Sequence, residues 1–141
     1  MTNIPQELNQ YFDVKNFDNY PLITIPQEFN DDRGSILNLA DGELGDVALI
    51  KSATGATRAN HYHLEDWHLC YVIDGKLNYS WKSIEDESAP SKLEVKSGSL
   101  IFTPKLIAHK LEFLEPTSLI IISKLSRISI KYELDTKKTQ I

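Results

Sequence analysis

From Leu22 onward the chain alternates between short apolar runs and polar turn sequences. Side chains on an extended strand point to opposite faces in turn, so alternation over about four to eight residues predicts a half-buried β-strand. The dipeptide Asp74-Gly75 lies between two apolar runs and predicts a tight hairpin. The pattern predicts about eleven short strands, over residues 22–25, 35–39, 47–52, 58–63, 68–73, 76–82, 92–95, 100–103, 109–114, 118–123 and 128–132.

Many short strands with hardly any helical periodicity predict an all-β sandwich or barrel. Residues 5–12 are the exception, because their apolar positions share one helical face. A chain of 141 residues fits one domain with a single core. We therefore expect an N-terminal extension over residues 1–20, a barrel over 21–133 and a polar tail over 134–141 that frays.

Composition and charge argue against some classes of partner and cellular location. The net charge of -5 argues against a nucleic-acid partner. The most apolar stretch, residues 119–122, is far shorter than the ~20 residues that span a bilayer, which argues against a membrane partner. The N-terminus has no signal-peptide pattern, and Cys70 is the only cysteine, so we expect a cytoplasmic protein without an intrachain disulfide.

The chain has four histidines, and their spacing is the main sign of chemistry. His61 and His63 lie two apart on a predicted strand, so both imidazoles should project from one face, as two nitrogen ligands to one metal ion would. His68 follows after a stretch long enough to turn onto a neighbouring strand, and His109 lies far down the chain. A single histidine on a strand is more often structural, so the metal hypothesis depends on whether the four meet.

The first histidine cluster resembles a known motif. Gly55, His61, His63, His68 and Gly75 have the spacing of the first motif of the cupin superfamily, G-x5-H-x-H-x3-4-E-x6-G. The histidine at position 68 stands where that motif usually has glutamate.

The later chain resembles the second cupin motif, G-x5-P-x-G-x2-H-x3-N. Gly98, Pro104 and His109 fall at its spacing, while Leu106 replaces its internal glycine and Phe113 its asparagine. The resemblance implies a double-stranded β-helix, the cupin jelly roll, behind a short N-terminal extension.

The cupin resemblance also implies a ligand set. Carried over by position, His61, His63, His68 and His109 would bind one divalent transition metal per chain, which would be Fe, Mn, Ni, Cu or Zn. Because glutamate is replaced, four neutral imidazoles would leave the charge of the metal uncompensated and favour an anionic substrate.

A second resemblance concerns a branch of the cupins. Residues 31–35 form a D-x-R-G-S element, and Arg58 begins a segment that leads into the two strand histidines. Both are similar to elements of the epimerases and ketoisomerases of dTDP-linked keto-deoxysugars, and of cupin domains in capsular polysaccharide synthesis. Ala59 stands where that branch often has glycine. The resemblance implies a catalytic role for His61 or His63 as the base that removes a proton next to a carbonyl.

Four further residues are candidates for binding a small-molecule substrate. They are Arg58, Tyr62, Trp67 and Tyr71. The more ordinary fate of such residues is a surface ion pair for the arginine and a place in the core or on the sheet surface for the aromatic rings.

Several functions remain open at this point. We expect a metal-binding cupin enzyme that acts on an oxygen-rich substrate such as a sugar or sugar nucleotide. The alternatives are a non-haem iron dioxygenase-type cupin, a metal-free sugar epimerase or isomerase, and a non-catalytic ligand-binding cupin. A histidine whose reactive nitrogen binds a metal cannot also take a proton, so the metal and the base hypotheses compete for the same side chains. We also expect a homodimer, with the runs 118–123 and 126–130 as candidate contacts.

Overall fold

The computed structural model describes residues 21–23, 28–40, 42–128 and 130–141. The helix expected over residues 5–12, and with it the N-terminal extension, lies outside the described residues. Within the described part, no helix is long and apolar enough to cross a bilayer.

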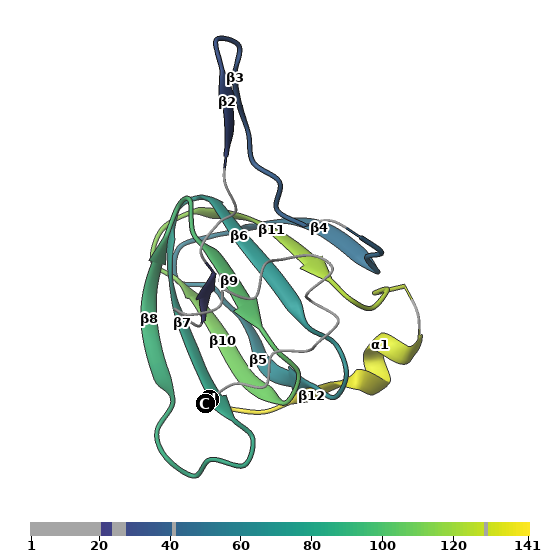
Figure 1. The fold of residues 1–141 in the computed structure, drawn as a ribbon. Coiled ribbons are helices and arrows are strands. Elements are labelled where there is room, and N and C mark those ends of the chain that lie inside the picture. Colours follow the sequence, from purple (N-terminus) through teal and green to yellow (C-terminus); the bar gives the residue numbers. More distant parts are fainter. Residues whose placement is uncertain (1–20, 24–27, 41, 129) are drawn as a thin grey trace.

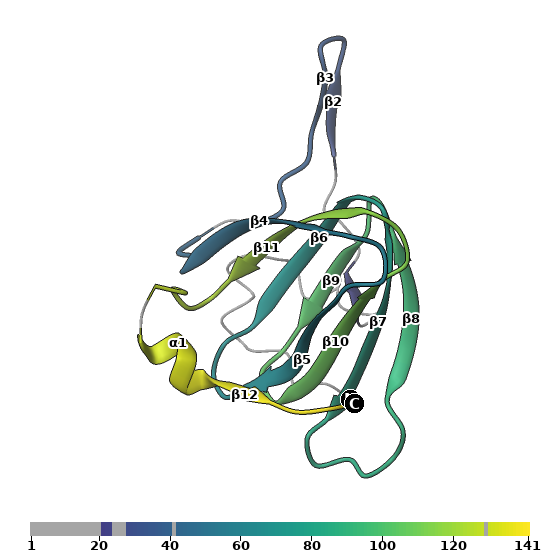
Figure 2. The same cartoon turned by 180° about the vertical axis from the view of Figure 1, so that it is seen from behind.

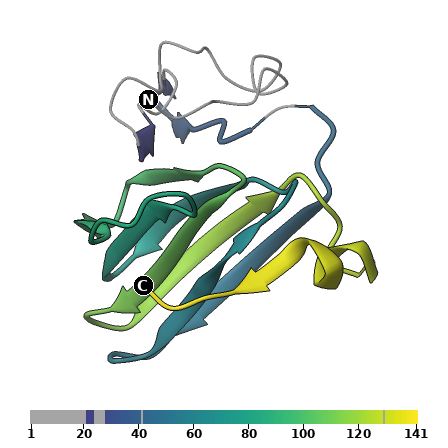
Figure 3. The ribbon, with the colours of Figure 1, turned by 90° about the horizontal axis from the view of Figure 1, so that it is seen from below.

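Two antiparallel five-stranded sheets face each other and form the barrel (Figures 1 and 3). The first sheet has the order β1 (Leu22–Ile23), β9 (Leu100–Thr103), β6 (His68–Asp74), β11 (Thr117–Ser123) and β4 (Asp46–Ser52). The second sheet has the order β12 (Thr136–Lys138), β5 (Thr57–His63), β10 (Ile107–Phe113), β7 (Lys76–Ser83) and β8 (Ser91–Lys96). This arrangement confirms the expected all-β double-stranded β-helix.

The turn at Asp74-Gly75 joins the two sheets, so the tight hairpin expected there is wrong. β6 pairs with β11 and β9 in one sheet, whereas β7 pairs with β10 and β8 in the other. Gly75 has φ +105°, and a Cβ at this position would lie 2.6 Å from the carbonyl oxygen of Pro116. The glycine is therefore required because the chain leaves one sheet for the other against a neighbouring loop.

The core is divided between the two faces of the first sheet. Cys70 and Ile101 are register partners and pack inside the barrel with residues from the second sheet, such as Leu77. Their neighbours Leu69 and Phe102 point to the opposite face, where Leu39 and Leu44 partly cover them. Alternation along the strands thus builds one apolar cluster inside the barrel and another outside it.

The C-terminal segment, which comprises the described residues after β11, differs from two expectations. The strand expected over 128–132 is wrong, because α1 (Ile130–Asp135) begins there. The tail does not fray, because β12 pairs with β5 and sets Thr136 opposite His63. Alternation along the sequence predicted a strand at 128–132, and the local pattern did not reveal that residues 136–138 pair with the free edge of β5. The segment crosses one end of the barrel (Figure 2).

A short hairpin projects from the barrel (Figure 1). It consists of β2 (Phe29–Asp31) and β3 (Gly34–Ile36), which pair only with each other. The backbone N–H of Arg33 donates to Oδ1 of Asp31 at 2.9 Å and its Nε–H donates to Oδ2 at 3.1 Å. The D-x-R-G-S element therefore forms the turn of this projecting hairpin, and Asp31 and Arg33 bind each other across it.

The position of β11 bears on the contacts expected for a dimer. This strand covers the whole run 118–123 and lies between β6 and β4. Both of its edges are occupied, so the run cannot pair edge to edge with a second copy.

Candidate metal centre and pocket

All four histidine rings gather at one place inside the barrel. His61 and His63 lie on β5, His109 lies opposite His61 on β10, and His68 begins β6. The ring centres of His61 lie 4.7 Å from His63 and 4.8 Å from His109, and the centres of His63 and His68 lie 4.5 Å apart. Strand alternation and the pairing of β5 with β10 are sufficient to bring three of these rings together.

The nitrogen atoms form two overlapping groups rather than one. His61, His63 and His109 each offer a nitrogen, and these atoms lie within 4.8 Å of one another. His63 and His68 form the second group together with the carboxylate of Asp66. The structure therefore brings the four histidines together but joins His68 to a carboxylate.

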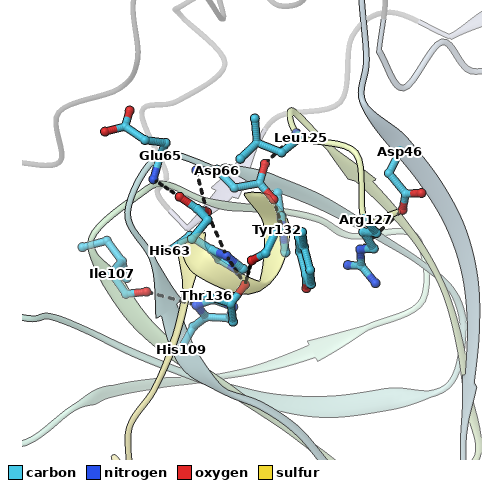
Figure 4. A network of polar contacts seen from close by, with 12 residues as sticks. Asp46, His63, Glu65, Asp66, Ile107, His109, Leu125, Arg127, Tyr132 and Thr136 are labelled. Atoms are coloured by element: carbon cyan, nitrogen blue, oxygen red, sulfur yellow. Dashed lines mark hydrogen bonds and ion pairs between the residues drawn. The ribbon is translucent and has the colours of Figure 1, made fainter. Parts of the chain in front are cut away.

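His109 has one nitrogen fixed by the backbone. Its Nδ1 lies 3.0 Å from the carbonyl oxygen of Ile107, which can only accept, so Nδ1 carries the proton (Figure 4). Burial holds the pKa of His109 well below its usual value, so the ring is neutral at pH 7 and Nε2 keeps a free lone pair. A ligating histidine commonly donates its other N–H to a carbonyl in this way.

His63 is fully buried and is contacted from the C-terminal segment. Its Nδ1 lies 3.3 Å from Oγ1 of Thr136 and 3.4 Å from Oδ2 of Asp135. Within the described part of the chain, its Nε2 is buried without a hydrogen-bond partner. Burial, followed by repulsion from His68 and His61, lowers the pKa of His63 to about 3. A buried nitrogen that lacks a partner is the kind of atom that a metal ion or substrate would satisfy.

Burial also lowers the pKa of His61 to about 4, with smaller contributions from the neighbouring His68 and Arg127. His61, His63 and His109 are thus all neutral at pH 7. Neutral imidazoles are the form that binds transition metals.

Two carboxylates hold the loop between β5 and β6 and the C-terminal segment together (Figure 4). Asp135 accepts the backbone N–H groups of Glu65 at 2.7 Å and of Asp66 at 3.2 Å. Asp66 in turn accepts the backbone N–H of Leu125 at 3.0 Å. Asp135 therefore binds the loop from the C-terminal segment, and Asp66 binds the C-terminal segment from the loop.

A pocket of about 160 Å³ opens beside the histidines. Its polar side is formed by Arg58, His61, His68, His109, Arg127 and Tyr132. Its apolar side is formed by Ile50, Cys70, Ile101, Leu111, Leu119 and Ile121. A mostly apolar cavity with a few converging polar groups is typical of a small-molecule site.

Of the four candidate substrate-binding residues, only Arg58 lines this pocket. Its Nε–H donates to Oγ of Ser52 at 2.7 Å. Trp67 and Tyr71 belong to the apolar cluster outside the barrel. Tyr62 lies between the two inward-pointing histidines on β5 and so faces the other way. We therefore no longer assign Tyr62, Trp67 and Tyr71 to substrate binding.

The structure adds residues that the sequence did not single out. Arg127 and Tyr132 line the pocket, and the Arg127 guanidinium lies 5.5 Å from the centre of the Tyr132 ring. Nε of Arg127 lies 3.4 Å from Oδ2 of Asp46. Arg127, Tyr132 and Asp135 come from the C-terminal segment, in which the sequence indicated no site residue. Asp66 had a signal, because it is an acid two residues before His68.

The barrel has a cupin-like jelly-roll fold, and its histidines face inward. Residues 29–137 match the family described as the polysaccharide biosynthesis C-terminal domain, and the chain belongs to this family. No curated protein sequence matches the chain.

Several solved structures have a similar fold. The capsular polysaccharide assembling protein CapF from Staphylococcus aureus is similar at 23% identity and a TM-score of 0.63, over 87% of this chain and 35% of that chain. This chain thus spans about a third of CapF. A mutant of the 3,4-ketoisomerase QdtA from Thermoanaerobacterium thermosaccharolyticum, in complex with TDP-4-keto-6-deoxyglucose, is similar at 14% identity and a TM-score of 0.63, over 85% and 88% of the two chains. The dTDP-4-dehydrorhamnose 3,5-epimerase from Sulfolobus tokodaii gives 15% identity and a TM-score of 0.63, over 89% and 78%. At these identities the likeness establishes the fold.

Proposed function

We propose that the chain is an enzyme that isomerises or epimerises a nucleotide-linked keto sugar, and that His61, His63 and His109 hold one divalent transition metal in its pocket. The observation that carries the proposal is the meeting of three neutral imidazoles, with nitrogens within 4.8 Å of one another, beside the pocket. The family description and the sugar-nucleotide enzymes of similar fold support the substrate class.

The donor set fits such a metal. Imidazole nitrogen suits Fe, Ni, Cu and Zn better than Mg or Ca. His109 presents Nε2 because Nδ1 donates to Ile107, and His63 has a buried Nε2 without a partner among the described residues. A bound metal would supply Lewis acidity toward a carbonyl oxygen, which makes the neighbouring C–H easier to deprotonate.

The other pocket residues fit an anionic substrate. The guanidinium groups of Arg58 and Arg127 are full positive charges on the pocket wall, although the whole chain has a net charge of -5. Guanidinium groups bind phosphate oxygens through charge-assisted hydrogen bonds, so these arginines would bind a nucleotide diphosphate. The apolar wall would exclude water from the sugar.

A second candidate is a metal-free reaction in which His63 is the base. It is favoured by the contact between Nδ1 of His63 and the carboxylate of Asp135, at 3.4 Å. A carboxylate at Nδ1 favours the tautomer with the proton there and leaves Nε2 as the proton acceptor. In this case Nε2 would take the proton from the carbon next to the carbonyl, which gives an enediolate. Isomerisation would return this proton to the former carbonyl carbon, while the neighbouring hydroxyl gives up its own proton to the former carbonyl oxygen and becomes the new carbonyl. Epimerisation would need a second group that protonates the same carbon from the opposite face.

A hydrogen-exchange experiment tests both candidates. TDP-4-keto-6-deoxyglucose and its UDP-linked counterpart are incubated in D2O with metal-loaded and chelator-stripped protein, and the sugar is followed by NMR. The proposal expects deuterium at a carbon next to the carbonyl with the metal-loaded wild type, and little exchange with stripped protein or with His109→Gln. Equal exchange by stripped protein that is lost in His63→Gln would favour the second candidate. No exchange in either form would overturn both.

The dioxygenase hypothesis predicts a different reaction. Fe(II)-loaded protein would have to consume oxygen with a diketone, thiol or phenol. The family description favours sugar chemistry over this reaction. A non-catalytic cupin would bind the sugar nucleotide and release it unchanged.

A further inference from the structure

Asp66 and His68 form a buried pair at the position where this chain departs from the usual cupin motif. The motif has glutamate where this chain has His68, and a carboxylate is found two residues earlier. Asp66 is fully buried, and its Oδ2 lies 2.9 Å from Nε2 of His68. The carboxylate missing from position 68 is thus supplied from position 66.

The contact decides which nitrogen of His68 carries a proton. Burial alone would favour a neutral Asp66, but hydrogen bonds from His68 and Leu125 and the nearby histidine charges lower the pKa of this carboxyl. Asp66 is therefore a carboxylate at pH 7, and a carboxylate can only accept hydrogen bonds. Nε2 of His68 must donate, so a neutral His68 has its free lone pair on Nδ1.

The same contact keeps His68 out of the nitrogen group formed by His61, His63 and His109. His68 belongs to the second group, in which it lies with Asp66 and His63. His68 nevertheless lines the pocket. It is close enough to contact a substrate while its Nε2 is held elsewhere.

We propose that Asp66 is a positioning residue that holds His68 outside the metal ligand set, fixes its tautomer, and leaves Nδ1 of His68 as a hydrogen-bond acceptor in the pocket. The carboxylate also keeps a negative charge next to the imidazoles, as the glutamate of the usual motif would. The role of His68 relative to the metal rests on the proposed function, whereas the tautomer of His68 does not.

The first test reads the tautomer directly. 15N NMR of metal-free protein at about pH 8, above the usual pKa of histidine, distinguishes a protonated ring nitrogen from an unprotonated one. The His68→Gln variant identifies the signals of His68. We expect a proton on Nε2 and none on Nδ1 in the wild type.

Asp66→Asn is the matched variant. Its side-chain oxygen can still accept the N–H of Leu125, so the link to the C-terminal segment is kept. Its amide group now donates toward Nε2, and His68 must move its proton to Nδ1, as in the corresponding change of a catalytic triad. We expect the two 15N signals to exchange character. A wild type with a proton on Nδ1, or the same tautomer in both proteins, would overturn the proposal.

The second test uses Zn²⁺ alone. His68→Gln should weaken zinc binding by less than about 10-fold, and His109→Gln should weaken it by more than about 100-fold. Equal large losses in the two variants would make His68 a ligand and overturn the proposal. A wild type that takes up no zinc would overturn the metal centre of the proposed function, and the NMR result would then decide the role of Asp66 by itself.

Discussion

Oδ2 of Asp135 lies 3.4 Å from Nδ1 of His63, so the last residue of α1 contacts the histidine pair on β5. The same carboxylate accepts the backbone N–H groups of Glu65 and Asp66. One side chain therefore fixes both the ring and the loop that follows it. The site depends on the C-terminal segment for its shape as well as for Tyr132 and Arg127.

Removing this carboxylate should destabilise the fold. Asp135→Ala leaves two backbone N–H groups without their acceptor, which should lower the free energy of unfolding by about 2–4 kcal/mol in urea denaturation. Glu133→Ala, on the exposed side of the same helix, is the control and should change it by less than about 0.5 kcal/mol. Equal effects of the two variants would contradict this account of the segment.

The stability of the metal-free protein should depend on pH through the buried histidines. Folding lowers the pKa of His61 to about 4 and that of His63 to about 3, from the usual 6.5. Below pH 6.5 the unfolded chain therefore binds more protons than the folded chain. The contribution of these histidines to the free energy of unfolding is complete above pH 6.5 and is lost as the pH falls toward 4. The fall in the free energy of unfolding between pH 6.5 and 4 is not due to Asp66. The pKa of this carboxyl is lowered from 3.8, so Asp66 takes up a proton only in stronger acid.

Urea denaturation between about pH 7 and 4.5 measures this dependence. The free energy of unfolding should fall steadily, and less steeply in His61→Gln. A free energy that stays constant over this range would show that the histidines are not buried as neutral groups.

Two departures from the cupin motifs coincide with strained backbone. Leu106 and Ala59 stand where the related motifs have glycine, and they have φ +61° and +65°. A left-handed conformation costs a residue other than glycine roughly 1–2 kcal/mol, part of which is offset by the greater flexibility of unfolded glycine. We expect Leu106→Gly to raise the free energy of unfolding by about 0.5–1 kcal/mol, since this side chain is already 37% exposed.

Ala59→Gly should act in the same direction. Ala53→Gly is the matched control, because Ala53 is not among the described residues with positive φ. It should lower the free energy of unfolding by about 0.5–1 kcal/mol. If Leu106→Gly and Ala53→Gly destabilise the protein alike, the strain account is wrong.

The projecting hairpin is the best candidate for the contact of a dimer. Phe29 and Ile36 are opposite each other on β2 and β3 and are 57% and 64% exposed. Among the described strands, β4 lies at the edge of its sheet and exposes Val47 and Leu49. We propose that the hairpin of one copy packs on β4 of a second copy. The exposed apolar side chains of the hairpin favour association with another apolar surface, and an edge strand such as β4 is open to a second chain.

Light scattering at micromolar concentration tests this contact. The wild type should have the mass of a dimer and Phe29→Asp/Ile36→Asp that of a monomer. Leu134→Asp, at a residue that is 65% exposed and lies outside both candidate runs, should leave the mass unchanged. A monomeric wild type would refute the dimer.

The positions of the histidines could be predicted because they follow from the chain itself. Alternation places His61 and His63 on one face of a strand, and the spacing of His109 from Gly98 and Pro104 matches a motif whose fold brings it opposite them. The partners of these histidines could not be predicted in the same way. Asp135 and Arg127 lie in a segment whose alternation predicted a strand, and the pairing of β12 with the free edge of β5 is not visible in the local sequence.

The aromatic candidates could not be placed from the sequence for a different reason. Trp67 and Tyr71 were candidates for lining a pocket, with a place in the core or on the sheet surface as the more ordinary fate. The first sheet is covered on both faces, so its outward side chains are also packed, and an aromatic residue there looks the same in sequence as one inside the barrel.

The most direct measurement is the metal content of untagged protein purified without added metal, by elemental analysis of the wild type and of the His61→Ala and His109→Ala variants. The account predicts close to one Fe, Mn, Ni, Cu or Zn ion per wild-type chain and almost none in either variant. A wild type without metal that also takes up none on titration would contradict the metal centre, and His63 with Asp135 would then be the base to test.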